Sequence, residues 1–511
     1  MKNLFLSLLS GLLMAFSWPS IGFAPLIFIA FIPLFCLENN VKNIKELFIY
    51  SIITFLVFNC ITTYWVYYST SIGSYVAFLL NSILMTLPIV MFSYIKKITN
   101  SRFGFIVFIL GWISFEYFHL NWDLSWPWLT IGNVFADFPY LIQWYEYTGF
   151  LGGSLWVLLV NTLFFISYKN RFRKKFLIYT SSFFFIPIII SFYLYSNTSY
   201  LNNQYLNVLI IQPNIDAYKK YNQDPYLNLN KFISQVKSDM RKDIDLVVGP
   251  ETALTFSISE HKLESHPSII QLRKMQQEFN RLNILIGATT WRKLDQKEVS
   301  ETSRYDRKSK TYYEMYNSVL FIPKYGKVRV YHKSRLVPGV EKMPFPKILD
   351  PIAELIVDLG GTSGSLGSDN KSNLFKIKNG ISIAPLVCYE SVYGELDISN
   401  SNLIAVVTND GWWKNTAGYK QHFSYSKIRA IENRKFVVRS ANTGISGIID
   451  YKGNVQSFTK WNEKTNIISR VFLNKEKTFY SKFGDYIGRI STFLYVILIL
   501  TVIVKRKTKL P

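Results

Sequence analysis

Long runs of apolar residues fill roughly the first 200 and the last 30 residues of this chain of 511 residues. A helix needs ~20 predominantly apolar residues to cross a bilayer, because the hydrocarbon core is ~30 Å thick. Hydrophobic residues make up 49% of the chain and charged residues 18%, below the ~25% of a typical soluble domain. The pattern predicts a membrane protein and excludes disordered, collagen-like and small disulfide-stabilised proteins.

About eight membrane spans are expected, seven before a large polar segment and one after it. The apolar runs are residues 4–18, 21–37, 47–67, 76–95, 105–120, 150–168, 176–195 and 487–504. We expect the first run to be retained and not cleaved as a signal peptide, because another apolar run follows at once. The predicted domains are a membrane domain over 1–195, a polar domain over 205–475, and a closing helix with a basic tail over 484–511.

Lys and Arg gather in the loops on one side of the expected membrane. They lie before the first span, in alternate short loops after it, and after the last span, whereas the loops 69–74 and 121–148 contain none. Loops rich in Lys and Arg stay in the cytoplasm. Both termini are therefore expected in the cytoplasm of a bacterium and the segment 196–486 on the periplasmic side of its inner membrane.

The net charge of +23 suits a partner with negative charge. No helix-turn-helix pattern or zinc-ligand spacing is visible, so the membrane and not nucleic acid is the expected partner. A transporter is the alternative for a chain of many spans, but its ionisable groups usually lie at mid-membrane. Here Glu116 and His119 lie near the outer end of the fifth span.

Four tryptophans lie close together in the expected outer loop. They are Trp122, Trp126, Trp128 and Trp144. Such a cluster is typical of an interfacial aromatic belt. The functional alternative is a lipid-binding rim.

The polar segment alternates short apolar runs with helical patterns. The runs expected as strands are 206–212, 246–248, 284–289, 318–322, 381–387, 403–408 and 436–440. Helical patterns cover 226–241, 266–282 and 417–434, and turn signals at 325–326 and 451–454 indicate hairpins. The expected fold is an α/β sandwich, with sheets covered by helices. Residues 351–359 are expected to form a lid, a membrane-dipping arm or an ordinary surface helix.

Three chemically capable side chains end three of these apolar runs. Cys388 is the only cysteine in the polar segment, since Cys36 and Cys60 lie in expected spans. A thiol at a strand end before a turn suits a nucleophile. Glu251 at another strand end suits a general base, and Lys333 at a third suits stabilisation of an oxyanion or a thiolate. Each alone is an ordinary residue, but together they indicate a catalytic site.

The order and surroundings of Glu251, Lys333 and Cys388 resemble the Glu-Lys-Cys triad of the nitrilase superfamily. With seven spans before the domain and one after it, the chain looks like the membrane-bound branch, the apolipoprotein N-acyltransferases. The segments that carry the resemblance are 250–253, 333–341, 388–390, 408–412, 429–434 and 439–444, with 126–128 and 147–161 in the membrane domain. It covers nearly the whole chain and implies a nitrilase-like αββα sandwich.

The resemblance also implies a reaction without a metal or cofactor. An acyl chain would pass from a phospholipid, typically phosphatidylethanolamine, through a cysteine thioester to the α-amine of a diacylglyceryl-cysteine that begins a lipoprotein, in a monomeric enzyme. Cys388 would be the nucleophile and Glu251 the base. Lys333, with the backbone N–H of Tyr389, would hold the oxyanion. Further matches to supporting or substrate-binding positions are Glu341, Tyr389, Glu390, Trp412 and Tyr221.

Two departures from the family pattern stand out. Tyr221 replaces a more usual Trp, and Gly339-Val340 replaces Phe-Gly before Glu341. For Tyr221 we expect altered lipid contact and retained activity, whereas Gly339-Val340 leaves the form of the local turn open. Two further alternatives share part of the site: a membrane-anchored nitrilase-like amidase, and a Cys–His hydrolase that uses Cys388 with His332 or His422.

Overall fold

In the computed structural model the described residues are 1–199, 204–346, 365–369, 373–377 and 380–507. The expected lid at 351–359 lies outside them. The chain divides into two compact units. One comprises Met1–Tyr67, Ser71–Thr198 and Lys482–Pro511, and the other Tyr68–Thr70 and Ser199–Ser481. The two units are described separately.

The first unit is helical. Its α-helices are α1 (Lys2–Ala15), α2 (Ile32–Asn40), α3 (Ile44–Thr63), α4 (Ser71–Ile98), α5 (Ser101–Leu120), α6 (Tyr145–Lys169), α7 (Lys174–Asn197) and α14 (Tyr486–Lys507). Six helical segments among the described residues are long and apolar enough to cross a membrane, those of α3 to α7 and α14. The first two expected spans fall instead on the shorter apolar segments Lys2–Ala15 and Ala24–Asn40.

Prolines explain why the first two runs are short. Pro19 follows the end of α1, and Pro25 and Pro33 lie in the first turns of the next two helical segments. Proline has no backbone N–H to donate, so it is favoured at a helix start and disfavoured in the interior, where α4 and α7 nevertheless contain Pro88 and Pro187. A helix of 14 residues spans only about 21 Å at ~1.5 Å per residue.

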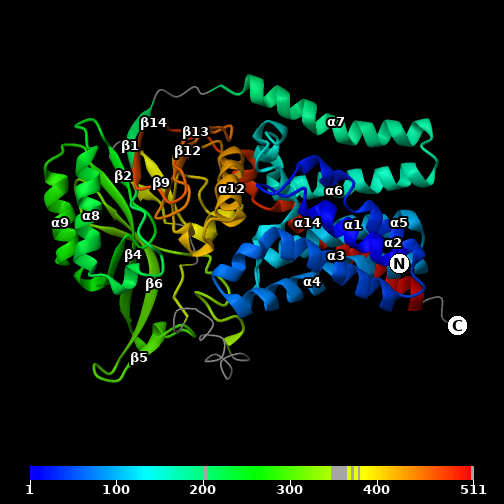
Figure 1. The fold of residues 1–511 in the computed structure, drawn as a ribbon, viewed down its shortest axis with the longest axis horizontal. Helices are drawn as coiled ribbons and strands as arrows, with labels where there is room; N and C mark the ends of the chain where they lie inside the picture. The colour runs from blue at the N-terminus through cyan, green and yellow to red at the C-terminus, as the bar shows by residue number, and fades with distance from the viewer. Residues whose placement is uncertain (200–203, 347–364, 370–372, 378–379, 508–511) are drawn as a thin grey trace. The chain divides into compact units, whose positions relative to one another are not determined.

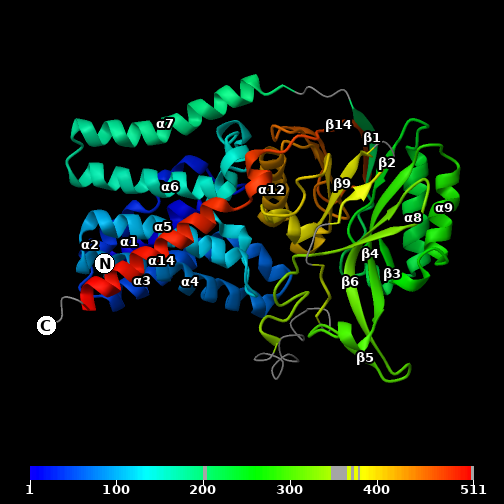
Figure 2. The same cartoon turned by 180° about the vertical axis from the view of Figure 1, so that it is seen from behind.

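The second unit contains two β-sheets (Figures 1 and 2). In the described residues the larger has the strand order β14-β1-β2-β4-β6-β5, with β3 on β4 and β7 on β6, and the smaller has the order β13-β12-β11-β10-β9-β8. The larger sheet comprises β1 (Tyr205–Gln212), β2 (Leu246–Val248), β3 (Leu254–Ser259), β4 (Asn283–Leu294), β5 (Arg304–Asp306), β6 (Thr311–Ile322), β7 (Arg329–His332) and β14 (Thr465–Phe472). The smaller comprises β8 (Phe375–Lys376), β9 (Ser382–Val387), β10 (Leu403–Thr408), β11 (Val437–Ala441), β12 (Gly447–Ile449) and β13 (Val455–Phe458).

The two sheets pack face to face, and helices cover their outer faces. One apolar core joins side chains of both sheets, among them Val208, Leu246, Ile383 and Leu403. A second core lies between the larger sheet and the helices α8 (Pro225–Ser238) and α9 (Pro267–Gln277), and a third between the smaller sheet and α12 (Ala417–Asn433). The expected αββα sandwich is therefore confirmed.

The predicted strands and helices of this unit lie close to where the sequence indicated. Both predicted hairpins form, as β6–β7 and β12–β13. Two strand groups are parallel, β1-β2-β4 and β9-β10-β11. Because carboxyl ends of parallel strands meet at one edge of a sheet, the residues that follow β2 and β9 are placed where α/β sites form.

Candidate active site

Glu251 lies in a tight loop after β2. It is buried, with 7% of its surface exposed, and the next residue, Thr252, has a left-handed φ of 49°. The loop crosses Gly287 of β4 so closely that a Cβ there would lie 2.6 Å from the Cα of Glu251. The glycine therefore lets the backbone of Glu251 approach the sheet.

Lys333 follows β7 and is enclosed by two carboxylates. Its Nζ lies 2.8 Å from Glu341 Oε2 and 3.9 Å from Glu251 Oε1. Asn317 Nδ2 donates to Glu251 Oε1 at 2.7 Å and to Glu341 Oε1 at 2.9 Å. The amide and the ammonium together hold the two carboxylates beside each other, so the structure brings together three of the predicted residues.

Cys388 begins the short helix Cys388–Val392 (η11) directly after β9, with a left-handed φ of 48°. Non-glycine residues adopt this conformation at a cost of ~1–2 kcal/mol. Glu390 stabilises the turn: its carboxylate accepts from the backbone N–H of Val387 at 2.8 Å and of Ser334 at 2.9 Å. Since Ser334 follows Lys333, Glu390 links the turn of Cys388 to the strand end that precedes Lys333.

His422 supports the turn that contains Cys388. Its Nε2 lies 3.0 Å from the carbonyl oxygen of Cys388, and its Nδ1 lies 2.9 Å from Asp410 Oδ1 and 2.9 Å from Arg439 Nη2. Nε2 also lies 2.9 Å from Ser391 Oγ, so both ring nitrogens are engaged by groups other than the Cys388 thiol. Asp410 is paired with Arg439 at 2.7 Å. This arrangement speaks against a Cys–His hydrolase that uses His422.

The groups Cys388, Asp410 and His422 offer ligand atoms within 4.8 Å of one another. The Arg439 guanidinium already neutralises Asp410 in this buried cluster. A metal ion would have to displace that cation, so we assign Asp410 and His422 a structural role. His332, the other histidine of the Cys–His alternative, is engaged by Glu260 at 2.6 Å and by Asp369 at 3.1 Å.

The pKa values of Cys388, Glu251 and Lys333 are shifted by different causes. Burial raises the pKa of the Cys388 thiol, Glu251 raises it further, and Lys333 opposes the rise. Burial also raises the pKa of Glu251, which Lys333 partly offsets. Burial alone would lower the pKa of Lys333, but the charges of Glu341, Glu251 and Cys388 raise it overall. Lys333 therefore stays protonated, and it lies beside Glu251, whose pKa is raised toward neutral pH.

The supporting residues lie at different depths. Tyr389 is buried and its hydroxyl accepts from Tyr393 at 3.0 Å, whereas Trp412, in the helix Asp410–Trp413 (η12), is half-buried. Tyr221 is 51% exposed. Its neighbour Lys220, which is only 2% exposed, was not among the predicted site residues. Its position beside Tyr221 was the only available signal.

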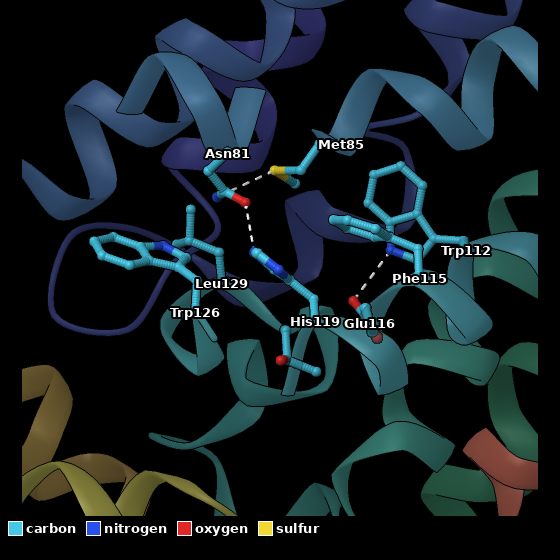
Figure 3. A pocket seen from close by; sticks show the side chains of 9 residues that line it. Asn81, Met85, Trp112, Phe115, Glu116, His119, Trp126 and Leu129 are labelled. Atoms are coloured by element: carbon cyan, nitrogen blue, oxygen red, sulfur yellow. Dashed lines mark hydrogen bonds between the residues drawn. The ribbon is translucent and has the colours of Figure 1, made fainter. Parts of the chain in front are cut away.

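In the helical unit, Glu116 and His119 line a small cavity between α4 and α5 (Figure 3). Trp122 Nε1 donates to His119 Nδ1 at 2.8 Å, and His119 Nε2 lies 2.9 Å from Asn81 Oδ1. Glu116 Oε1 accepts from the backbone N–H of Ile131 at 2.8 Å. These bonds connect the loop after α5 to the helices.

The expectation of an exposed tryptophan belt or rim is wrong for Trp128. It is 4% exposed and packs edge-on against Trp65, with ring centroids 4.8 Å apart. Trp144 is half-buried, packs against Trp156 and donates to the carbonyl of Leu141 at 3.1 Å. Packing against Trp65, which composition does not reveal, buries the Trp128 ring.

Comparison with known proteins agrees with this architecture. Residues 10–163 match the model of the apolipoprotein N-acyltransferase N-terminal domain, and residues 208–477 match that of carbon-nitrogen hydrolases. Among solved structures, a CN-hydrolase superfamily protein from Xanthomonas campestris is 17% identical, with a TM-score of 0.36 over 52% of this chain and 91% of that chain.

Curated relatives match along most of their length. The apolipoprotein N-acyltransferase of Chlorobaculum tepidum is 29% identical over 99% of this chain and 97% of its own. That of Rickettsia bellii is 30% identical over 79% of this chain and 78% of its own. A membrane domain followed by a carbon-nitrogen hydrolase domain is thus matched in order and extent, and the chain belongs to the apolipoprotein N-acyltransferase family, an acyltransferase branch of the carbon-nitrogen hydrolase superfamily.

Proposed function

We propose that this membrane protein moves an acyl chain from a phospholipid, through a thioester on Cys388, to the α-amine of the diacylglyceryl-cysteine that begins a lipoprotein. The observation that carries this proposal is the environment of the Cys388 thiol. The thiol is buried at the end of β9, in a residue with a left-handed φ, and the charges of Glu251 and Lys333 both act on its pKa. Family membership supports lipoprotein N-acylation as the general activity.

In the first half-reaction Glu251 takes the proton of the Cys388 thiol, and the thiolate attacks the ester carbonyl of the phospholipid. Lys333, with the backbone N–H of Tyr389, stabilises the tetrahedral oxyanion. The carbon–oxygen bond then breaks, Glu251 returns the proton to the leaving glycerol oxygen, and a lysophospholipid departs. The acyl group remains on sulfur.

In the second half-reaction the α-amine of the acceptor attacks the thioester carbonyl. Glu251 takes the proton that the amine loses, the carbon–sulfur bond breaks, and the thiolate of Cys388 regains a proton. An amide replaces a thioester, which is a downhill exchange. Glu341, the closer ion-pair partner of Lys333, keeps that ammonium in place through both steps.

The alternation of Lys and Arg in the loops supports a periplasmic location of the catalytic unit and cytoplasmic termini. There the enzyme would work as a monomer, with phosphatidylethanolamine as the expected donor and diacylglyceryl lipoproteins as acceptors. Both substrates are lipids of one membrane, so an enzyme anchored in that membrane meets them at high effective concentration.

Trapping the acyl-enzyme tests the proposal. The full chain in detergent is incubated with phospholipid labelled in its acyl chain, and the labelled residue is located by mass spectrometry. Cys388→Ala should abolish the label and the N-acylated product, while Cys36→Ala and Cys60→Ala should retain both. A labelled acyl-enzyme in Cys388→Ala would show that another residue is the nucleophile.

A further inference from the structure

The described residues 365–369 lie against β6, next to the proposed active site. The backbone N–H of Gly367 donates to the carbonyl of Met315 on this strand at 2.8 Å. A Cβ at position 367 would lie 2.4 Å from the ring of Tyr316, so the glycine lets the backbone approach the strand closely. The segment is therefore fixed to the larger sheet at this point.

The same segment holds the loop of Glu341 through its backbone. The N–H of Leu366 donates to the carbonyl of Glu341 at 2.8 Å. Two residues further along that loop, the N–H of Met343 donates to Ser365 Oγ at 3.0 Å. The carboxylate of Glu341 is the ion-pair partner of Lys333 Nζ at 2.8 Å. A shift of the segment would therefore displace the partner of the lysine.

Asp369, the last residue of the segment, contacts His332. Its Oδ1 lies 3.1 Å from Nδ1 of the imidazole, and the ring stacks on Tyr316 with centroids 3.8 Å apart. The other ring nitrogen, Nε2, lies 2.6 Å from Glu260 Oε1 in the short helix Glu260–Lys262 (η7). Because His332 directly precedes Lys333, the segment contacts both parts of the chain that place the Lys333 ammonium.

The contact between Asp369 and His332 depends on the protonation of the imidazole. The charged and titratable groups that face the ring are Glu260, Asp369 and Tyr316, and Arg292 of β4 acts on the two carboxylates. Burial opposes the charged ring, but the hydrogen bonds and charges of Asp369 and Glu260 raise the pKa of His332 to about 9. Above that pH one ring proton remains for two carboxylates. We expect it to stay in the shorter contact with Glu260, so the longer contact with Asp369 is lost.

We propose that Asp369 is a positioning residue for the acyl transfer, which through His332 keeps residues 365–369 against the loop of Glu341 and so holds Lys333 where the oxyanion forms. Asp369 takes part in no proton transfer, and no covalent bond to it forms or breaks. The inference rests on the proposed role of Lys333 as the cation that stabilises the oxyanion. The chemical step, and not the binding of phospholipid, should therefore depend on Asp369.

The test measures the rate of acyl-enzyme formation in the full chain in detergent, with the concentration of labelled phospholipid varied at each pH. Asp369→Ala should lower the rate at saturating phospholipid by ~10-fold near neutral pH, because a displaced active-site cation stabilises the oxyanion less well. The KM for phospholipid should stay unchanged. The ratio of the wild-type rate to the variant rate should fall toward 1 as the pH rises through about 9, because the wild type then loses the same contact.

Further variants make this result specific. Asp243→Ala, at an exposed aspartate of the same unit, is the matched control and should keep the wild-type rate. His332→Gln should slow acylation, and adding Asp369→Ala to it should cause no further loss, because the contact is already absent. Asp369→Asn, which keeps the size and loses the charge, takes the place of Asp369→Ala if thermal unfolding shows that the alanine variant does not fold.

A wild-type rate near neutral pH in a folded Asp369 variant overturns the inference. A loss that is the same at every pH, or that appears only in the KM for phospholipid, also overturns it, and so do additive losses in the double variant. A wild-type rate in Lys333→Ala would instead refute the proposed role of the lysine itself.

Discussion

At the scale of single residues, the two carboxylates around Lys333 have different roles. Glu341 is the closer ion-pair partner, at 2.8 Å against 3.9 Å for Glu251. Glu341 also accepts from the backbone N–H of Val337 at 2.9 Å, so it is held on both sides. Glu251 is the less tightly paired of the two, and burial raises its pKa. It is therefore the carboxylate suited to exchange a proton with the thiol.

Replacing that base should block the first half-reaction. Glu251→Gln keeps the size of the side chain but cannot accept the thiol proton, so thioester formation should fall by ~10²-fold or more. The measurement is labelled acyl-enzyme against time. Glu278→Gln, on an exposed pair with Lys237, is the matched surface control and should have no effect.

His422 separates this mechanism from the Cys–His alternative in the same assay. His422→Gln keeps an amide donor for the carbonyl of Cys388, so its rate should stay within ~10-fold of the wild type, the equivalent of one hydrogen bond. A wild-type rate in Glu251→Gln, together with a collapse in His422→Gln, would make the histidine the base.

At the scale of elements, strand ends present the proposed catalytic groups, and close backbone contacts hold those ends. The loop of Glu251 rests on Gly287 of β4, and the turn of Cys388 is tied by Glu390 to the residue after Lys333. The two sheets therefore contribute different parts of the site: Glu251 and Lys333 follow strands of the larger sheet, and Cys388 follows a strand of the smaller.

A methyl group at position 287 should displace the loop that holds Glu251. In Gly287→Ala the new Cβ would lie 2.6 Å from the Cα of Glu251, so that loop must shift. We expect a loss of ~1–3 kcal/mol in unfolding free energy, as for other overpacked sites, and a large decrease in acylation. Gly326→Ala is the control: its φ of +96° is strained but its surroundings are open, so it should cost ~1 kcal/mol and leave acylation intact. Normal acylation in Gly287→Ala would show that the loop tolerates displacement.

His332, the last residue of β7, gives this strand end a pH-dependent contact with residues 365–369. Burial alone would lower its pKa, but the hydrogen bonds and charges of Asp369 and Glu260 raise it to about 9. A raised pKa stabilises the folded state fully below the unfolded value of ~6.5, and this contribution is lost as the pH rises through about 9. The difference in Tm between wild type and His332→Gln should therefore be largest near pH 6 and shrink toward pH 10.

The control for this experiment is His261→Gln, at an exposed histidine of the same unit. Its difference in Tm from the wild type should be small at every pH. A difference for His332→Gln that does not change with pH would mean that the contact with Glu260 and Asp369 does not depend on a charged imidazole.

At the scale of the whole molecule, the helical unit determines on which side of the membrane the proposed reaction takes place. The catalytic unit is inserted between α7 and α14, so the membrane sides reached by these two helices decide its compartment. The basic residues at the end of α14 and at Lys509 favour a cytoplasmic C-terminus. A reporter enzyme that works only in the cytoplasm should be active when it is fused after Lys509. A reporter that works only in the periplasm should be inactive at the same site. Activity of a periplasmic reporter at that site would reverse the proposed topology.

The sequence by itself determined the features that depend on local pattern. Apolar runs close to the length that a bilayer requires predicted most of the membrane helices, and short apolar runs ending at Glu251, Lys333 and Cys388 predicted the strands that carry the proposed catalytic groups. Such patterns are readable because each concerns residues close in the chain, whose burial repeats with the period of the helix or strand. The αββα fold followed from the alternation of these elements together with the family resemblance.

Only the tertiary structure decided the contacts between residues far apart in the chain. The pairing of β1 with β14 joins residues more than 200 positions apart, and no local pattern encodes it. The same holds for the support of Cys388 by His422, for the burial of Trp128 against Trp65, and for the burial of Lys220. A lysine or a tryptophan looks the same in a sequence whether it meets water or a partner, because its environment is made by segments that meet only when the chain has folded.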